Sequence, residues 1–338
     1  MGEGAHDLAE LVRAELSRQA PPHARRLAAA ILERVGPAAA AVVFYGSCLR
    51  KDTAEGVLDF YVLVDDYRSA LGSGLLALSS AALPPTVFYI ECPDSECPEG
   101  ERPDSERPEG EPQGDPGSTL RAKYALLSLA DFAEGARPGG FRTGIFARFC
   151  QPALAVEIRD EPVREALVSS CVQSILTAAR IFAPVVGGPA SSAELWQTAF
   201  AETYAAEMRA ERPETIRTLH DAAPGRYARA LRGALAELDD TGVFPVRWQG
   251  ERFEVTAAHG FLERSRRSWR RRRSAAKFVY VGQLLKTAFT MGDWLPYALW
   301  KLERQSGVHI PYTERQRRHP FIFGWPLLYK ALKTRALH

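Results

Sequence analysis

The spacing of hydrophobic and polar positions changes from a helical to a strand pattern within the first hundred residues. Apolar residues three or four apart predict amphipathic helices over residues 6–18 and 23–35. Gly36, followed by proline, ends the second of these helices. Runs of β-branched and aromatic residues then predict three strands, over residues 41–45, 58–64 and 86–91. The N-terminal part therefore predicts a small sheet with helical cover.

A stretch rich in proline, glutamate and glycine interrupts this pattern at residues 92–117. It contains an imperfect ten-residue duplication, PDSECPEGER followed by PDSERPEGEP. Such a composition cannot bury enough apolar surface to order itself. We expect a disordered acidic insert between two strands of the sheet, which resumes at residues 123–127.

Helical periodicity dominates the rest of the chain. A mostly helical stretch over residues 160–238 precedes a turn and a short extended piece over residues 242–253. Residues 261–273 are strongly basic, and the next residues place apolar side chains on one helical side. The predicted fold class is α+β, a small mixed sheet with helices, then a helical domain, then a basic amphipathic C-terminal region. The corresponding domain boundaries enclose residues 1–160, 161–250 and 251–338.

Composition and charge add a cationic C-terminal region to this picture. The chain has 338 residues, of which 46% are hydrophobic, so a large core is expected. Its formal net charge is only +2, but about 18 Lys and Arg stand against about 6 Asp and Glu from Glu251 onward. The C-terminal region is therefore cationic and the remainder carries an excess of acids.

Several classes of protein lack their signatures here. Five cysteines without a CxxC pair indicate free thiols in a reducing compartment and argue against structural zinc. The acidic N-terminus and the lack of a long apolar run predict neither a signal peptide nor a spanning helix, so we expect a cytoplasmic protein. The sequence has no HExxH, GxSxG, Walker or GxGxxG motif, as a zinc protease, serine hydrolase, P-loop or Rossmann protein would have.

The candidate chemistry lies in the stretch FYGSCLRKDTAEGVLDFYVLVDD, residues 44–66. Its first strand ends in Gly46 and Ser47, and its second strand opens with Asp59. A glycine lets the backbone approach a triphosphate, while a serine hydroxyl and exposed N–H groups bind phosphate oxygens. An aspartate supplies the hard oxygen that Mg²⁺ prefers. This pattern is that of a nucleotidyltransferase.

A second metal-binding carboxylate is missing from the strand itself. Most such enzymes place it two residues further on, on the same face, where this chain has Tyr61. Asp65 faces the same way but lies about 20 Å from Asp59 in a regular strand. The missing ligand must therefore come from elsewhere, and the candidates are Glu91 and an acid of the helical region.

Further segments occur in the order found in one enzyme family. Lys123-Tyr124 follows the Gly-Ser turn and the Leu-Asp-Phe strand, and other matching segments lie at residues 147–152, 204–209 and 277–286. Over most of residues 40–290 the chain thereby resembles the mitochondrial translocator assembly and maintenance family. Its members are peripheral CTP:phosphatidate cytidylyltransferases that make CDP-diacylglycerol. That family also carries an apolar residue two positions after its strand aspartate.

The resemblance implies a site and its partners. Gly46 and Ser47 would hold the triphosphate of CTP, and Lys123 and Arg148 would bind anionic oxygens of the triphosphate or of phosphatidic acid. Asp59, with Glu207, would hold Mg²⁺. From the residues alone, Glu207 is better explained as a surface glutamate paired with Arg209 or Arg212. Lys123 and Arg148 are equally well explained as solvated charges. Cys48 and Ala125 depart from the family, since each stands where it has a glycine.

The basic region predicts attachment to the inner face of a membrane. Aromatic residues interleave with cations there, as expected where rings lie at the level of lipid headgroups. The predicted membrane-binding residues are Arg270, Arg271, Arg272, Lys277, Lys286 and Trp294. A solvated helix face, a nucleic-acid-binding surface, which we do not favour, or aromatic residues of the core are the alternatives.

Two other functions fit the same residues. The arginine run is compatible with a nucleotidyltransferase that acts on RNA or a small alcohol. Cys48 and the missing strand carboxylate are compatible with a non-catalytic adaptor at a membrane surface, built on a decayed transferase domain.

Overall fold

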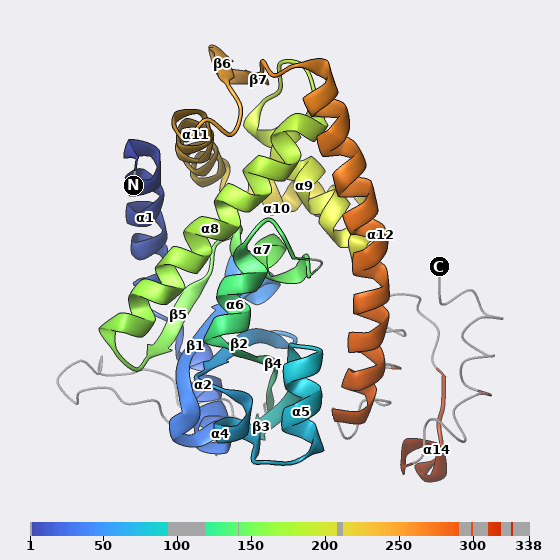
Figure 1. Cartoon of the computed structure of the whole chain (residues 1–338). Helices are drawn as coiled ribbons and strands as arrows, with labels where there is room; N and C mark the ends of the chain where they lie inside the picture. Colours follow the sequence, from blue (N-terminus) through green and yellow to red (C-terminus); the bar gives the residue numbers. More distant parts are fainter. Residues whose placement is uncertain are drawn as a thin grey trace. The chain divides into compact units, whose positions relative to one another are not determined.

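The computed structural model describes residues 2–93, 119–140, 142–207, 212–290, 299, 310–318 and 326 (Figure 1). The chain divides into two compact units, residues 1–284 and 285–338. The expected insert at residues 92–117 lies, beyond Pro93, outside the described residues. The boundaries expected at residues 160 and 250 fall inside the first unit.

A five-stranded mixed sheet forms the base of the first unit. Its strands are β1 (Ala39–Tyr45), β2 (Leu58–Val64), β3 (Thr86–Pro93), β4 (Thr119–Ser128) and β5 (Leu154–Ile158). They lie in the order β3-β4-β2-β1-β5, with β2 and β4 parallel and the other neighbours antiparallel. The three N-terminal strands and β4 agree with the sequence pattern, whereas β5 was not predicted.

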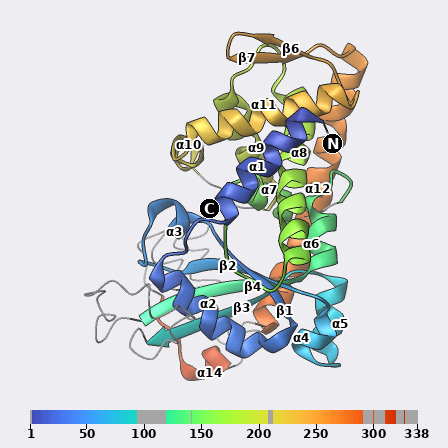
Figure 2. The same cartoon turned by 90° about the vertical axis from the view of Figure 1, so that its left-hand side faces the viewer.

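Each face of the sheet packs against helices because successive side chains of a strand point to opposite sides. On one face Phe44, Phe60 and Leu126 pack against α2 (Pro22–Val35), which lies along the sheet in Figure 2. On the other face Val43 and Leu63 join a larger core with the helical region. Strands buried on both sides explain why β2 is an almost uninterrupted apolar run.

The short helices between the strands set the path of the chain around the sheet. They are α3 (Ser47–Lys51), α4 (Tyr67–Leu71), α5 (Leu75–Ala82), α6 (Leu129–Ala136) and α7 (Gly144–Phe149), together with a 3₁₀ turn at Gly36–Ala38. Asp66 caps α4 by accepting hydrogen bonds from two backbone N–H groups, as expected for an acid at the end of a strand.

Helices α8 (Glu161–Val186), α9 (Ser192–Ala206), α10 (Pro213–Asp221) and α11 (Pro224–Asp240) form the predicted helical region. The N-terminal helix α1 (Glu3–Leu16) packs mainly against α11 and α8, with fewer contacts to strand β5 of the sheet. Gly4 permits this approach, because a Cβ there would lie 2.5 Å from the carbonyl oxygen of Gly233. Within the described part of the chain, only α8 is long and apolar enough to span a membrane, and 67% of its apolar window is buried in this core.

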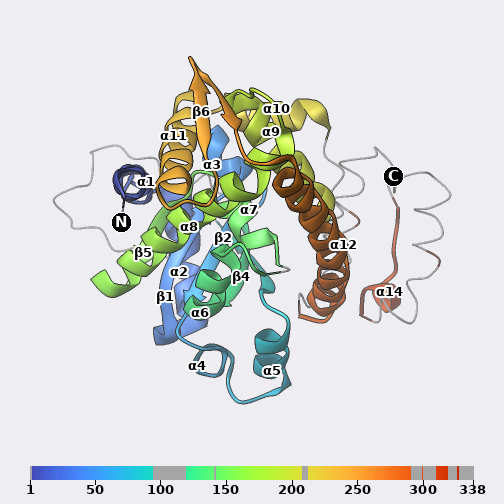
Figure 3. The same cartoon turned by 45° about the horizontal axis from the view of Figure 1, so that its top comes forward.

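The last elements of the first unit are a hairpin and most of a long helix, whose final residues, from 285 onward, belong to the second unit. Strands β6 (Val246–Gln249) and β7 (Arg252–Val255) pair antiparallel, and α12 (His259–Thr290) follows and runs past α9 and α7 (Figure 3). Trp269 of α12 is 4% exposed and packs edge-on against Phe182. At this position the aromatic residue belongs to the core and not to a lipid surface. In the second unit, α14 (Glu314–Arg318) is described.

Candidate functional site

The turn after β1 brings its backbone against the first residues of β2. Gly46 has φ 93° and ψ −157°, a conformation that favours glycine. A Cβ at this position would lie 2.8 Å from Oδ2 of Asp59. Ser47 follows at the exposed start of α3. The predicted Gly-Ser turn and the strand aspartate therefore lie directly beside each other.

Asp59 lies in a row of polar residues that crosses the sheet. It is opposite Tyr45 of β1 on one side and opposite Lys123 of β4 on the other, and Lys123 is opposite Tyr89 of β3. Paired residues of neighbouring strands point to the same face. The ammonium of Lys123 lies 2.9 Å from Oδ1 of Asp59, and the two side chains are 33% and 18% exposed. Sequence positions 46, 59 and 123 thus form one site, which we call the Asp59 site.

Tyr61 occupies the position, two residues after Asp59, where the nucleotidyltransferase pattern would have a second carboxylate. Its ring lies 5.2 Å from that of Tyr45 and 5.1 Å from that of Phe149, measured between centroids. Burial is the main reason that the pKa of its hydroxyl is raised, so the group stays a neutral phenol. The position belongs to a buried aromatic cluster, and an ionised acid would be costly there.

Arg148 and Glu207 form a buried ion pair beside this aromatic cluster. Nη2 of Arg148 donates to Oε2 of Glu207 at 2.7 Å, and Nη1 donates to Oε1. Burial disfavours the charged guanidinium, but Glu207 outweighs it, so the pKa of Arg148 is raised. Gly144 makes room for the pair, because a Cβ there would lie 2.8 Å from Oε1 of Glu207.

This pairing does not fit the expected roles of its two members. Glu207, 5% exposed at the end of α9, accepts a hydrogen bond from Arg148 at each carboxylate oxygen, so its charge is already neutralised by the guanidinium. Among the described residues its partner is Arg148 and not Arg212, whereas the other expected partner, Arg209, lies outside the described residues. Both Nη groups of Arg148 are used in turn, so its guanidinium is not presented to a phosphate. The pair joins α7 to the end of α9 and lies near Tyr61, whose pKa responds to both of its charges.

The other acids considered lie away from the Asp59 carboxylate. Glu91 is on the same face but is half exposed, with Arg121 at 3.2 Å and the hydroxyl of Tyr89 donating to it at 2.6 Å. Asp65 pairs with Arg159 at 2.6 Å. Within the described residues, no three His, Cys, Asp or Glu side chains form a group that could hold a metal ion.

Asp59 alone retains the properties of a magnesium ligand. Its Oδ1 is buried and accepts no aligned hydrogen bond from the described residues, although it lies in the ion pair with Lys123. Mg²⁺ in nucleotide sites needs only one or two carboxylates, because phosphates and water complete the octahedron. The residues present therefore fit one Mg²⁺ brought with a nucleotide, held by Asp59 without Glu207.

Cys48 lies beside the site, close enough for the charges of Asp59 and Lys123 to act on its thiol. Its side chain is buried in the core under α2, and its thiol lies 3.7 Å from the carbonyl oxygen of Val57. Burial raises the pKa of this thiol, so it remains protonated. The residue has ordinary negative φ. The cysteine in place of a glycine therefore adds core contact and leaves the phosphate turn at Gly46 unstrained.

The predicted membrane-binding residues fall into three groups. Arg270, Arg271 and Lys277 are exposed on α12, and Lys286 is half-buried. Trp294 lies outside the described residues. The prediction for Arg272 is wrong, because its side chain is 9% exposed and points into the first unit, toward α7. In a helix, neighbouring residues point about 100° apart, so a run of four arginines cannot all face the same surface.

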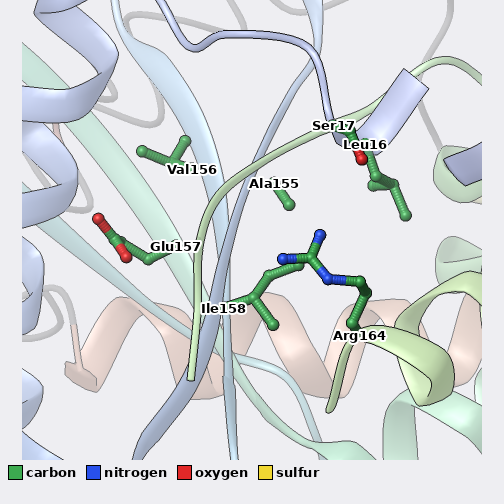
Figure 4. Close-up of a pocket in the computed structure, with 7 residues that line it drawn as sticks. All are labelled: Leu16, Ser17, Ala155, Val156, Glu157, Ile158 and Arg164. Atoms are coloured by element: carbon green, nitrogen blue, oxygen red, sulfur yellow. The ribbon is translucent and has the colours of Figure 1, made fainter. Parts of the chain in front are cut away.

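A pocket of 520 Å³ at the β5 edge of the sheet holds none of the predicted site residues (Figure 4). It is lined by backbone and side chains of residues 155–158, the end of α1 at Ser17, and Arg164 of α8. Sequence reasoning also did not identify Tyr45 and Tyr89, which flank the Asp59 pair in the row across the sheet. The two tyrosines can be recognised only by their positions opposite Asp59 and Lys123. These positions depend on which strands pair and in what register.

Comparison with known proteins identifies no family whose model matches this chain. No curated protein is significantly similar to it.

Proposed function

We propose that the protein is a Mg²⁺-dependent nucleotidyltransferase that moves CMP from CTP onto phosphatidic acid at an anionic membrane surface. The observation that carries the proposal is the convergence of Gly46, Asp59 and Lys123 on one face of the sheet, with Ser47 exposed beside them. These residues come from three separate parts of the sequence. Their types are those that phosphate and magnesium chemistry requires.

The roles follow from what each group can donate or accept. The Ser47 hydroxyl and the backbone N–H groups of the turn bind oxygens of the triphosphate. Asp59 would hold Mg²⁺, which would supply positive charge to neutralise the phosphates and Lewis acidity toward the α-phosphoryl group. Lys123 is the point charge next to this carboxylate and stabilises the negative charge that develops as pyrophosphate leaves. The lipid phosphate is the nucleophile that attacks the α-phosphorus.

Arg148 and Glu207 have a positioning role in this proposal. Their buried bidentate pair fixes α7 against the end of α9, over the aromatic cluster that contains Tyr61. Tyr61 is two residues from Asp59 on the same strand face. The pair therefore supports the strand segment that presents the carboxylate, without contact with the nucleotide.

Exposed side chains of α12 support attachment to a membrane. Arg270, Arg271 and Lys277 are exposed, and the nearby apolar side chains of Phe278 and Val281 are 79% and 42% exposed. Each cation near an anionic leaflet contributes about 1 kcal/mol, and exposed rings insert at headgroup level. This combination favours a lipid surface as the partner of the helix.

The test is transfer of label from α-labelled CTP into extractable lipid, with Mg²⁺ and phosphatidic acid vesicles. Wild-type protein should transfer label, and Asp59→Asn should lose at least a thousandfold in rate while keeping its fold and vesicle binding. Asp65→Asn is the matched control, since Asp65 is a strand-end acid paired with Arg159, and it should retain activity. An active Asp59→Asn protein would refute the assignment.

A non-catalytic adaptor is the second candidate. It is favoured by the neutralisation of Asp59 by Lys123 and of Glu207 by Arg148. Absence of any Mg²⁺-CTP-dependent rise in the unfolding temperature, together with intact vesicle binding, would support the adaptor. Transfer of label to RNA and not to lipid would support the alternative in which the protein is a nucleotidyltransferase with an RNA acceptor.

A further inference from the structure

Arg272 of α12 is a buried cation with an incomplete set of hydrogen bonds. Its Nη1 donates to the carbonyl oxygen of Pro138 at 2.6 Å, and its guanidinium carbon lies 5.1 Å from the ring centre of Phe146. Its Nε and Nη2 are buried and meet no acceptor in the described part of the chain. The N–H groups of Nε and Nη2 point in parallel along one edge of the guanidinium, which is the fork that binds a carboxylate or phosphate bidentately.

Arg226 shows what completes such an arrangement in the same protein. Its Nη1 donates to a backbone carbonyl, that of Cys150. Its Nε and Nη2 donate to the two carboxylate oxygens of Glu15, at 2.8 and 3.2 Å. The side chain of Arg226 is 9% exposed, and Arg272 as a residue is also 9% exposed. The two arginines therefore differ chiefly in the oxyanion that the Arg226 fork binds.

Arg272 remains charged at neutral pH without a carboxylate partner. Burial is the cause that lowers its pKa, to about 10. The nearest acids of α12 and α9 are engaged with other groups: Glu263 with Arg266, and Glu202 with Trp269 and Arg273. A buried charge without a counter-ion is destabilising, so an anion that reaches the fork gains a strong interaction.

We propose that the Nε–Nη2 fork of Arg272 binds a phosphate group, in a site bounded by α12, α7 and the loop after α6. These segments lie side by side in Figures 1 and 3. Gly139, next to Pro138, is exposed and borders open space, since no atom lies within 4 Å of a Cβ built there. The parallel N–H groups of the fork match two oxygens of a phosphate group, which can accept both hydrogen bonds at once.

This site lies on the other side of α7 from the Arg148–Glu207 pair, and its proposed ligand does not depend on nucleotidyl transfer. Phe146 contacts Arg272, and Arg148 contacts Glu207. Residues two apart on a helix point about 200° apart, so the two guanidinium groups lie on opposite sides of α7. The phosphate comes either from a free anion or from a lipid headgroup, and the two sources can be distinguished by experiment.

The experiment measures thermal unfolding of the full-length protein in inorganic phosphate and in chloride at equal ionic strength. Phosphate should raise the midpoint of wild-type protein by several degrees, and also that of Arg271→Met, the exposed neighbour. Arg272→Met should lose this rise. In chloride, its unfolding midpoint should lie within a few degrees of the wild-type midpoint. Arg272→Lys keeps the charge but not the fork, so it should lose most of the rise, and it serves if the methionine variant does not fold.

The second arm measures flotation of the protein with vesicles made of a neutral carrier lipid. Either phosphatidic acid or phosphatidylserine is added to this lipid, at equal total charge. A lipid source requires that Arg272→Lys weakens binding to phosphatidic acid selectively, whereas a free-anion source requires an effect only in the unfolding arm. An equal phosphate shift in wild type and both Arg272 variants would overturn the proposal. So would the absence of any shift together with unchanged vesicle binding.

Discussion

Gly46 meets two demands that no other residue type satisfies together. Its φ of 93° lies in the region that favours glycine, and its Cα faces the Asp59 carboxylate at a distance that leaves no room for a methyl group. Gly72 has a similar backbone, φ 76°, but a Cβ there would meet nothing within 4 Å. A comparison of alanine substitutions at the two glycines therefore separates two costs, that of the backbone conformation and that of the close approach to Asp59.

Gly46→Ala should destabilise the protein by about 1–2 kcal/mol more than Gly72→Ala, because only the former forces Asp59 to move. Urea unfolding measures the difference, and equal losses would mean that Asp59 adjusts freely. The same substitution should reduce nucleotidyl transfer, while Gly72→Ala leaves it unchanged.

The Arg148–Glu207 pair allows a second comparison at the scale of single residues. Glu207→Gln leaves a buried guanidinium without its counter-ion and should cost about 3–5 kcal/mol of unfolding free energy. Glu165→Gln removes the partner of Arg13 in an ion pair whose side chains are 51% and 44% exposed, and should cost less than about 1 kcal/mol. If both cost the same, the pair at α7 would be a surface-like contact.

Asp131, in the first turn of α6, connects three elements. It accepts hydrogen bonds from Tyr67 of α4 at 2.8 Å, from Ser128 at the end of β4 at 2.9 Å, and from Arg142 before α7 at 2.8 Å. Burial raises the pKa of its carboxyl, but the bonds from Tyr67, Arg142 and Ser128 together outweigh burial and lower it below 3.8. The ionised carboxylate therefore holds α4, the end of β4 and the segment before α7 together more strongly than the protonated acid would.

Asp131→Asn should cost about 2 kcal/mol of unfolding free energy at pH 7. Because the folded pKa lies below the ordinary value, this stabilisation is present above pH 3.8 and is lost as the pH falls through the folded pKa. Denaturant unfolding at pH 7 and near pH 3 tests this, since the difference between wild type and variant should shrink at the lower pH. A constant difference would contradict a role for the charge.

The local sequence pattern predicted the helices and strands better than it predicted which of them pack together. The helical spacing of α1 and α2 and the apolar runs of β1 and β2 are intrinsic to short segments, and the structure confirms them. The edge strand β5 was missed because five residues with mixed burial carry little periodicity. The packing of α1 on α11 depends on contacts more than two hundred residues apart, such as Arg226 with Glu15.

The residues of the candidate site also divide into those that local sequence predicts and those that depend on contacts between distant segments. Gly46, Ser47 and Asp59 are close in sequence, and their type and spacing predicted a turn against a strand, which the structure confirms. The ion pair between Arg148 and Glu207 arises only when α7 meets the end of α9. The residues alone therefore suggested solvated charges, and the family resemblance suggested a phosphate ligand and a metal ligand, but neither predicted the pair. Among the arginines of α12, burial depends on the helix face, which a basic run cannot reveal.

At the scale of the whole molecule, the exposed cations of α12 and the buried Arg272 make different contributions. Arg270, Arg271 and Lys277 are exposed, and their replacement leaves the core intact. Arg272 contacts α7 and the loop after α6. In the proposed membrane-bound state, the exposed cations would meet the lipid surface, while the contacts of Arg272 inside the first unit would stay as they are.

The triple substitution Arg270→Gln, Arg271→Gln and Lys277→Gln should weaken binding to anionic vesicles about 100-fold, from about 1 kcal/mol per cation. Its unfolding temperature should stay within a few degrees of wild type. Vesicle flotation at low and high salt measures the effect, which should diminish as salt screens the charges. Unchanged binding at low salt would assign membrane attachment to other residues.

The hairpin of β3 and β4 has a consequence for engineering the protein. Pro93 and Thr119 are paired across the two strands, so the ends of the intervening segment are held next to each other by the sheet. Loop-closure entropy rises only slowly with length once the ends are fixed. A two-residue Asn-Gly turn or a whole fluorescent domain with close termini can therefore replace that segment, which makes this hairpin a natural place for a reporter of where the protein goes in the cell.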